Sequence, residues 1–264
     1  MNLNLSLIKS FQRFKQNQFL FEELVKRDFK KKYKRTVLGI GWSLLSPLLT
    51  LLVMKLVFTQ FFGRNTPHYT IYIFCGNVVW FYFNEATKGG MRALMENSGI
   101  FTKVNVPKYL FVLSKNFQSL ISFFLTILIL LVFVIFDKIP ITWKFLMLLY
   151  PICMLVFFNI GCGMILSAWY IFFRDVEYLY DVFLRLLMYM SAIFYQVDRY
   201  GPTVQRIFLI NPIYVFIKYF RNIIIAGTIP SFSYHMLMFF YTAVVLVLGC
   251  VMYKKNNTRF LYYV

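Results

Sequence analysis

The sequence contains few charged residues for a chain of 264. Asp, Glu, Lys and Arg together make up 14% of it, whereas about 25% is usual for a soluble domain. So little charge cannot cover the surface of a water-soluble globule of this size. Because 60% of the residues are hydrophobic and 21% are aromatic, the composition instead predicts a chain that is surrounded by lipid.

The sequence also lacks the motifs that would give it a reaction of its own. It has no GxxxxGK[ST] loop, so it cannot hydrolyse ATP in the P-loop manner, and HExxH and GxSxG are absent too. His68 and His235 each stand alone near an expected helix end, which does not favour a metal site. The cysteines show no CxxC spacing and lie in apolar segments, which favours small buried side chains over metal or redox ligands: Cys75, Cys153, Cys162 and Cys250.

Acidic residues are scarce as well. There are 28 Lys and Arg against 10 Asp and Glu, which gives a net charge of +18. In a soluble protein this excess would indicate nucleic acid. Here the cations lie mainly at the ends of apolar runs, so they indicate membrane topology and contact with anionic lipid headgroups, and no nucleic-acid partner is expected.

Long apolar runs are what the sequence has in abundance. A helix needs about 20 apolar residues to cross the roughly 30 Å hydrocarbon layer. We therefore predict an all-α membrane protein with six transmembrane helices, over residues 37–62, 69–87, 109–136, 143–173, 178–197 and 234–253.

Several local features refine this prediction. Pro47 predicts a kink near Ser46, and Gly163 with Ser167 forms a small-xxx-small pair that permits close helix packing. Residues 207–226 are apolar but interrupted by polar and proline residues. Two short re-entrant or interfacial helices on the outer side fit this stretch better than an ordinary span.

The N-terminal region, residues 1–36, differs from the rest. Its apolar positions between 19 and 29 recur at helical spacing and lead into a run of cations, a pattern typical of an amphipathic helix in the headgroup layer. We divide the chain into this interfacial region and a six-span transmembrane domain over 37–264. No cleavable signal peptide is evident, so the first span is expected to act as an uncleaved signal.

The distribution of cations predicts the topology. Ten Lys and Arg precede the first span, four lie between the second and third spans, and three follow the last span. The positive-inside rule then places both termini in the cytosol. We expect a multi-pass protein of a bacterial cytoplasmic membrane.

A set of short motifs occurs in a characteristic order. It comprises LVKRDFK at 24–30, KYKRTVLG at 32–39, GWSLLSPL at 41–48, KVNVPK at 103–108, FFRDV at 172–176 and NPIY at 211–214. In order and spacing the set resembles type 2 ABC permeases that export O-antigen polysaccharide and teichoic acid. One departure is Val106, at a position where many relatives carry a bulkier aromatic residue.

The resemblance implies both an architecture and partners. It implies a homodimer of six-span permeases with an N-terminal gate helix and outer re-entrant helices. It also implies two copies of a separate ABC ATPase, which would bind ATP and Mg, so that this chain needs no cofactor and is not an enzyme. The implied substrate is a polysaccharide linked to a polyprenyl pyrophosphate.

The candidate site residues fall into three groups. Cations at headgroup depth suit a pyrophosphate, although topology and anionic lipid explain them equally: Arg27, Lys30, Lys31, Lys34 and Arg35. Aromatic side chains suit a sliding polymer, although interfacial belts and lipid-facing surfaces use them too: Tyr72, Trp80, Phe81, Tyr82, Tyr178 and Tyr195. Residues between the spans suit contact with the ATPase, although a solvated loop would look the same: Glu96, Asn97, Phe101, Lys103, Pro107, Lys108, Arg174 and Asp175.

A few ionisable residues raise further hypotheses. Arg174, Asp175 and Glu177 could form an ion pair on the inner side. Lys55 and Glu85 lie at membrane depth, where an ionisable residue indicates a functional site or snorkels to the headgroups.

Two other functions fit parts of the pattern. An integral membrane transferase for lipid-linked sugars would share the basic interface, but it should also show paired intramembrane carboxylates. An ABC permease for a drug or a small lipid would share the architecture.

Overall fold

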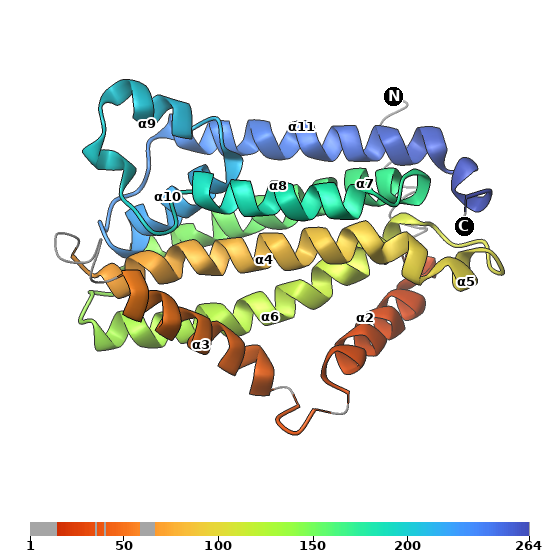
Figure 1. Cartoon of the computed structure of the whole chain (residues 1–264), viewed down its shortest axis with the longest axis horizontal. Coiled ribbons are helices and arrows are strands. Elements are labelled where there is room, and N and C mark those ends of the chain that lie inside the picture. The colour runs from red at the N-terminus through yellow and green to blue at the C-terminus, as the bar shows by residue number, and fades with distance from the viewer. Residues whose placement is uncertain (1–14, 35, 40, 59–66, 264) are drawn as a thin grey trace.

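The computed structural model describes residues 15–34, 36–39, 41–58 and 67–263, and within these residues it contains helices and no strand. The long helices α4, α6, α7, α8 and α11 run alongside one another (Figure 1), whereas α2 and α3 diverge from this bundle. The elements in chain order are α2 (Gln18–Tyr33), α3 (Gly41–Phe58), α4 (Tyr69–Glu96), α5 (Ser98–Phe101), α6 (Tyr109–Phe136), η2 (Trp143–Leu148), α7 (Leu149–Phe172), α8 (Val176–Met190), η3 (Val197–Arg199), α9 (Pro202–Phe208), α10 (Pro212–Ile224), α11 (Phe232–Asn256) and η4 (Arg259–Leu261).

Four helical stretches are both long and apolar enough to cross a membrane: Gly41–Phe58, Tyr109–Phe136, Trp143–Phe172 and Phe232–Asn256. The pair α9 and α10 passes the same test when taken together, but the two helices are bent by 110° at their junction. The chain is therefore an all-α, multi-pass membrane protein. The predicted total of six spans stays a prediction.

The boundaries of the predicted spans differ in how well they agree with the helices. The third span has the same bounds as α6, and the fourth corresponds to η2 followed by α7. The second span is wrong at its end, because α4 continues to Glu96 instead of stopping near residue 87. The extra turns are held by α8, since Lys88 pairs with Asp181 at 2.7 Å and Arg92 pairs with Glu177.

The fifth predicted span is also too long. Helix α8 ends at Met190, and the residues from 191 to 196 form turns. The physical reason is a buried cation. The Arg221 guanidinium on α10 donates hydrogen bonds to the carbonyl oxygens of Ala192 at 2.9 Å and Ile193 at 2.8 Å, and to that of Tyr72 at 3.2 Å. It therefore fastens α10 to α4 and to the turn after α8.

Small residues bring the central helices into close contact. A side chain at Gly90 on α4 would meet the Cα of Gly163 on α7 at 2.8 Å, which confirms that Gly163 permits close packing. Gly161 on α7 approaches the backbone of Val245 and Leu246 on α11 equally closely. The bundle is therefore built on backbone proximity, as is common in membranes.

Candidate functional site

The arm formed by α2 and α3 encloses a cleft against α4 and α6. Its volume is about 800 Å³, within the range of ligand sites in proteins. Figure 1 shows α2 and α3 diverging from α4 and α6. The cleft is thus bounded by two helices that pass the spanning test and by the helix of the N-terminal region.

Two walls of the cleft are lined with hydroxyl groups. On α6 the residues Lys115, Ser119, Ser122 and Thr126 recur at helical spacing and so share one face. Ser119 and Thr126 donate their hydroxyl hydrogens to the carbonyl oxygens four residues earlier, at 3.1 and 2.9 Å. Their oxygen atoms can still accept hydrogen bonds from a ligand. The facing wall on α3 adds further hydroxyls: Ser43, Ser46 and Thr50.

Aromatic side chains complete the lining. The rings of Tyr82 and Phe123 are stacked, with centroids 4.5 Å apart, and the Tyr82 hydroxyl donates to Asn116 at 2.8 Å. Phe81 and Trp42 also line the cleft. A site with aromatic faces beside many hydrogen-bonding groups suits a sugar, whose ring faces are apolar and whose edges carry hydroxyls.

One ion pair crosses the cleft. Lys32 on α2 places its Nζ 2.7 Å from Glu85 on α4 and 3.2 Å from the Ser122 hydroxyl on α6. Both charged side chains are about one third exposed. Lys32 therefore links the arm to the bundle while remaining accessible to a ligand in the cleft.

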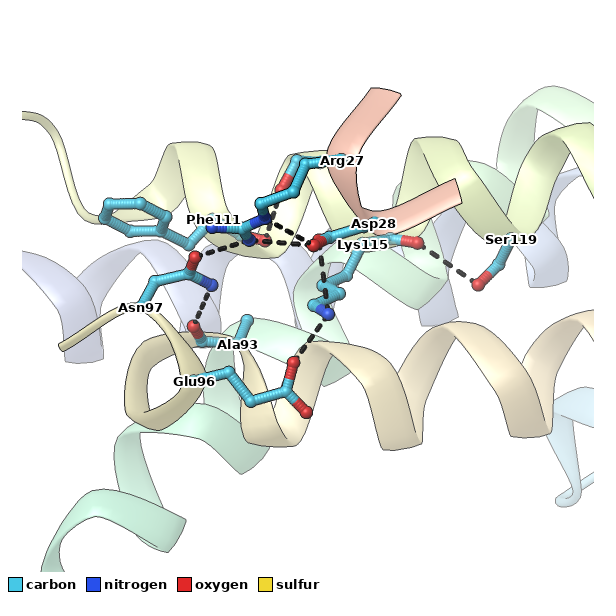
Figure 2. Close-up of polar contacts among 9 residues, drawn as sticks. Arg27, Asp28, Ala93, Glu96, Asn97, Phe111, Lys115 and Ser119 are labelled. Carbon is cyan, nitrogen blue, oxygen red and sulfur yellow. Dashed lines mark hydrogen bonds and ion pairs between the residues drawn. The ribbon is translucent and has the colours of Figure 1, made fainter. Parts of the chain in front are cut away.

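A more deeply buried charged cluster anchors α2 beside the cleft (Figure 2). The Arg27 Nη2 donates hydrogen bonds to Asp28 and to Asn97, both at 2.7 Å, and Lys115 lies between Asp28 and Glu96. The Lys115 Nζ is 2.7 Å from Glu96 and 3.2 Å from Asp28. Because the Asp28 side chain is only 1% exposed, its charge depends on these partners. We call these five residues the α2 anchor.

The predicted pyrophosphate cations do not share one environment. Arg27 belongs to the α2 anchor, whereas Lys30, Lys31 and Lys34 are exposed. The spacing places Arg27, Lys30 and Lys31 on one face of α2, and Lys34 follows the end of the helix in an extended conformation. Arg35 lies outside the described residues.

The predicted polymer-lining aromatics are dispersed through the chain. Phe81 and Tyr82 line the cleft, whereas Trp80 is buried in the core and Tyr178 is exposed on α8. Two others meet near the bent pair α9 and α10, because the hydroxyl of Tyr72 donates to the carbonyl of Tyr195 at 2.6 Å.

The predicted coupling residues mostly gather around α5. Glu96 and Asn97 belong to the α2 anchor, and Phe101 packs against Phe111 with ring centroids 5.9 Å apart. Lys103 is exposed and Pro107 is half-buried. The Lys108 Nζ donates to the carbonyl of Asn257 at 2.5 Å and to its side-chain oxygen at 3.2 Å, and burial lowers the pKa of Lys108.

The predicted ion pair among Arg174, Asp175 and Glu177 is wrong, because the cation that pairs with Glu177 lies on another helix. Glu177 pairs with Arg92 on α4, and Arg174 instead lies over the ring of Tyr170, 5.4 Å from the centroid. Both Arg174 and Asp175 are exposed. The sequence could not show this, because the partner comes from an extension of α4 that was expected to be loop.

Three charged residues at or beside the cleft were not expected from the sequence, whereas a fourth had been expected at membrane depth. Lys32, Asp28 and Lys115 were not singled out, although the polar periodicity from 115 to 126 marks a polar face inside an apolar helix. Glu85, identified as an ionisable residue at membrane depth, lines the cleft. Lys55 is exposed on α3.

The comparison with known families gives the class of this protein. The family described as "ABC-2 type transporter" matches residues 19–225, which include α2, the cleft and most of the bundle. The chain therefore belongs to the ABC-2 type transporter family and is a transport subunit.

Individual relatives match over most of the chain. An "O-antigen export system permease protein RfbA" from Klebsiella pneumoniae is 26% identical over 247 residues, which cover 92% of this chain and 95% of the relative. A protein of the same name from Myxococcus xanthus is 28% identical over 192 residues, or 72% of this chain and 73% of the relative. The "Polysialic acid transport protein KpsM" of Escherichia coli is 20% identical over 252 residues, which cover 94% and 97%.

Proposed function

We propose that this chain is the transmembrane permease subunit of an ABC exporter that moves a polysaccharide across the bacterial cytoplasmic membrane. The observation that carries the proposal is the nearly full-length similarity to permeases named for O-antigen export and for polysialic acid transport. Membership of a transporter family argues against the membrane transferase considered above.

The chemistry of the cleft supports a carbohydrate rather than a drug or a small lipid. Its walls carry hydroxyl groups on α3 and α6 and an aromatic pair, Tyr82 and Phe123. Such walls offer many weak and similar contacts, so a chain of sugars can move past them without being held at one place. A purely apolar substrate would leave these polar groups without partners.

The finer features of the proposal follow the resemblance. The substrate would be a polymer, such as O-antigen or teichoic acid, on a polyprenyl pyrophosphate. Its phosphates would meet the cations of α2 from Arg27 to Lys31, together with Lys34 after the helix, because Arg and Lys are favourable partners for such an anion. We place both termini in the cytosol on the distribution of cations.

The proposed assembly is a homodimer with two copies of an ABC ATPase. Helix α3 exposes apolar side chains such as Leu52, Val53 and Leu56, which lipid or a second permease could cover. The segment from Glu96 to Lys108 would receive the motion of the ATPase. It is suited to this role because the α2 anchor and the Lys108 contact to Asn257 connect it with α2, α6 and α11.

The proposal is tested by coexpressing the tagged chain with the ABC ATPase encoded beside it. We expect the ATPase to copurify, and we expect inverted vesicles with both proteins to take up lipid-linked polysaccharide on addition of ATP. Deleting the gene should abolish the surface polymer, and an ATPase variant without its P-loop lysine is the control. Normal surface polymer after deletion, with no copurifying ATPase, would contradict the proposal.

A further inference from the structure

A second groove shares no lining residue with the cleft. Its volume is about 980 Å³, and it runs between the start of α6, the middle of α7 and the last turns of α11. The residues before α6 and before α2 close its polar end. None of the described residues that we proposed above to contact the pyrophosphate or the sugar chain lines this groove.

The groove has one polar end and one apolar wall. The polar end carries two lysines, Lys108 and Lys254, together with amide side chains such as Asn105 and Asn257, and none of the described residues that line the groove is acidic. Its apolar wall includes Leu113, Phe157, Ile160, Met164 and Leu246, and the side chains of Tyr109 and Tyr253 also line the groove. The five apolar side chains cannot form hydrogen bonds with a sugar, and they suit an acyl chain.

The length of the groove corresponds to one leaflet of a bilayer. From Asn257 to Leu246 it follows α11 for 11 residues, which is about 16 Å of helix. The hydrocarbon layer is about 30 Å thick, so the groove extends from the headgroup level to about the midplane. Phe157 at its deep end is 48% exposed, which leaves the groove open to the surrounding lipid.

The positive charge at the polar end of the groove favours a lipid with an anionic headgroup. Lys108 is buried, its ammonium contacts the two oxygens of Asn257 and lies 5.8 Å from the centroid of the Phe101 ring, and no carboxylate among the described residues pairs with it. A buried ammonium without a counter-ion is favourable only if an anion approaches it. A second copy of the chain would bring further positive charge to this place, since each copy carries +18.

We propose that this groove binds one anionic phospholipid of the cytosolic leaflet, with its phosphate near Lys108 and Lys254 and an acyl chain against Ile160 and Leu246. The lipid would connect the segment before α6 with the end of α11. The site does not depend on which polymer is exported. Only the assignment to the cytosolic leaflet rests on the proposed topology.

The test uses the full chain reconstituted in vesicles of phosphatidylcholine. A trace of phosphatidylglycerol with a photoactivatable acyl chain is added, and peptides that carry the lipid are identified by mass spectrometry. The matched probe is phosphatidylcholine with the same acyl chain. We expect the phosphatidylglycerol probe to label the peptides around Ile160 and Leu246 in preference to the phosphatidylcholine probe.

Two substitutions separate charge from general lipid contact. Lys254→Gln should lower labelling by the phosphatidylglycerol probe about fivefold, which corresponds to about 1 kcal/mol for one lysine near a membrane surface. Lys255→Gln is the matched control, because Lys255 is exposed on the next position of α11, does not line the groove and removes the same charge. It should leave the labelling within about twofold. Cys250→Trp, on the exposed wall of the groove, should reduce labelling by either probe.

Three outcomes would overturn the proposal. Equal labelling by the two probes would mean ordinary lipid contact, and equal effects of Lys254→Gln and Lys255→Gln would exclude a phosphate at this place. Labelling that appears only after removal of residues 1–14 would mean that the chain's own N-terminal segment fills the groove. None of these outcomes changes the export assay, so the proposed function is tested separately.

Discussion

The bundle around α7 and α11 and the arm formed by α2 and α3 are held in different ways. In the bundle, Gly161 and Gly249 bring two backbones together so closely that an added Cβ would meet backbone atoms at 2.8–2.9 Å. The arm is packed less tightly: α2 buries the apolar side chains of Leu24 and Val25, and α3 buries Ser43 and Leu51. Polar contacts add to these, through the α2 anchor and the ion pair of Lys32 with Glu85.

This difference separates a rigid part from a part that can move. Dispersion contacts between closely packed backbones are lost together when the helices separate. Ion pairs can be exchanged one at a time for water, lipid phosphate or substrate phosphate. The cleft lies between the two parts, so a movement of the arm changes its width.

The largest effect is expected from Lys115→Met. The substitution leaves the buried Asp28 carboxylate without its partner on α6, which costs about 3–5 kcal/mol in the free energy of unfolding. The measurement is unfolding in mixed micelles with increasing SDS. Lys30→Met, which removes an exposed lysine of α2, the helix that carries Asp28, is the control. Adding Asp28→Asn to Lys115→Met should recover part of the loss, and a double variant no more stable than Lys115→Met would argue against the buried pair.

Gly161→Ala should be the next most harmful change. The new Cβ would meet the backbone of Val245 and Leu246 at 2.8 Å, so α7 and α11 must separate, at a cost of about 3 kcal/mol, the upper end for overpacked sites. The midpoint of thermal unfolding in detergent measures this. Gly99→Ala is the control, because nothing lies within 4 Å of its added Cβ. Equal midpoints for the two variants would mean that the bundle does not depend on this approach.

A smaller change in stability is expected from the ion pair across the cleft. Lys32→Glu or Glu85→Lys alone should cost at most about 1 kcal/mol, because both side chains are partly exposed. The double exchange should restore stability. If Lys32 also meets the substrate phosphate, the exchanged pair still fails in the vesicle uptake assay. Full recovery of uptake by the exchanged pair would limit Lys32 to a structural role.

The smallest change in stability is expected for the exposed cations of α2. Lys30→Gln and Lys34→Gln should alter the free energy of unfolding by less than about 0.5 kcal/mol, since both side chains are exposed. They should nevertheless reduce the uptake of lipid-linked polymer if this face receives the pyrophosphate. Lys138→Gln, which changes an exposed lysine after α6, is the control. Unchanged uptake in both α2 variants would assign the cations to topology alone.

The sequence predicted much of the helical architecture, but it did not predict much of the candidate site. The bounds of α6 were predicted because its apolar run ends sharply at Asp137 and begins after Lys108. The ends of α4 and α8 were not, because they depend on Arg92, Glu177 and Arg221, whose partners come from other helices. Phe81 and Tyr82 line the cleft, whereas their neighbour Trp80 is buried in the core. Residue type alone does not separate them, and contact of any of the three with a polymer stays a prediction.

The sequence alone shows that this is a helical membrane protein. The free energy of placing a helix in lipid depends on the residues of that one continuous segment, and not on which other helices lie beside it. The sequence also determined an order of motifs that agrees with the ABC-2 family over residues 19–225. Which polar side chains contact one another depends instead on how the helices pack in the tertiary structure. Lys32 and Glu85 are 53 positions apart, and Arg27 and Asn97 are 70 apart. An ion pair depends on a few ångströms of separation, a distance that is set by how all the helices pack.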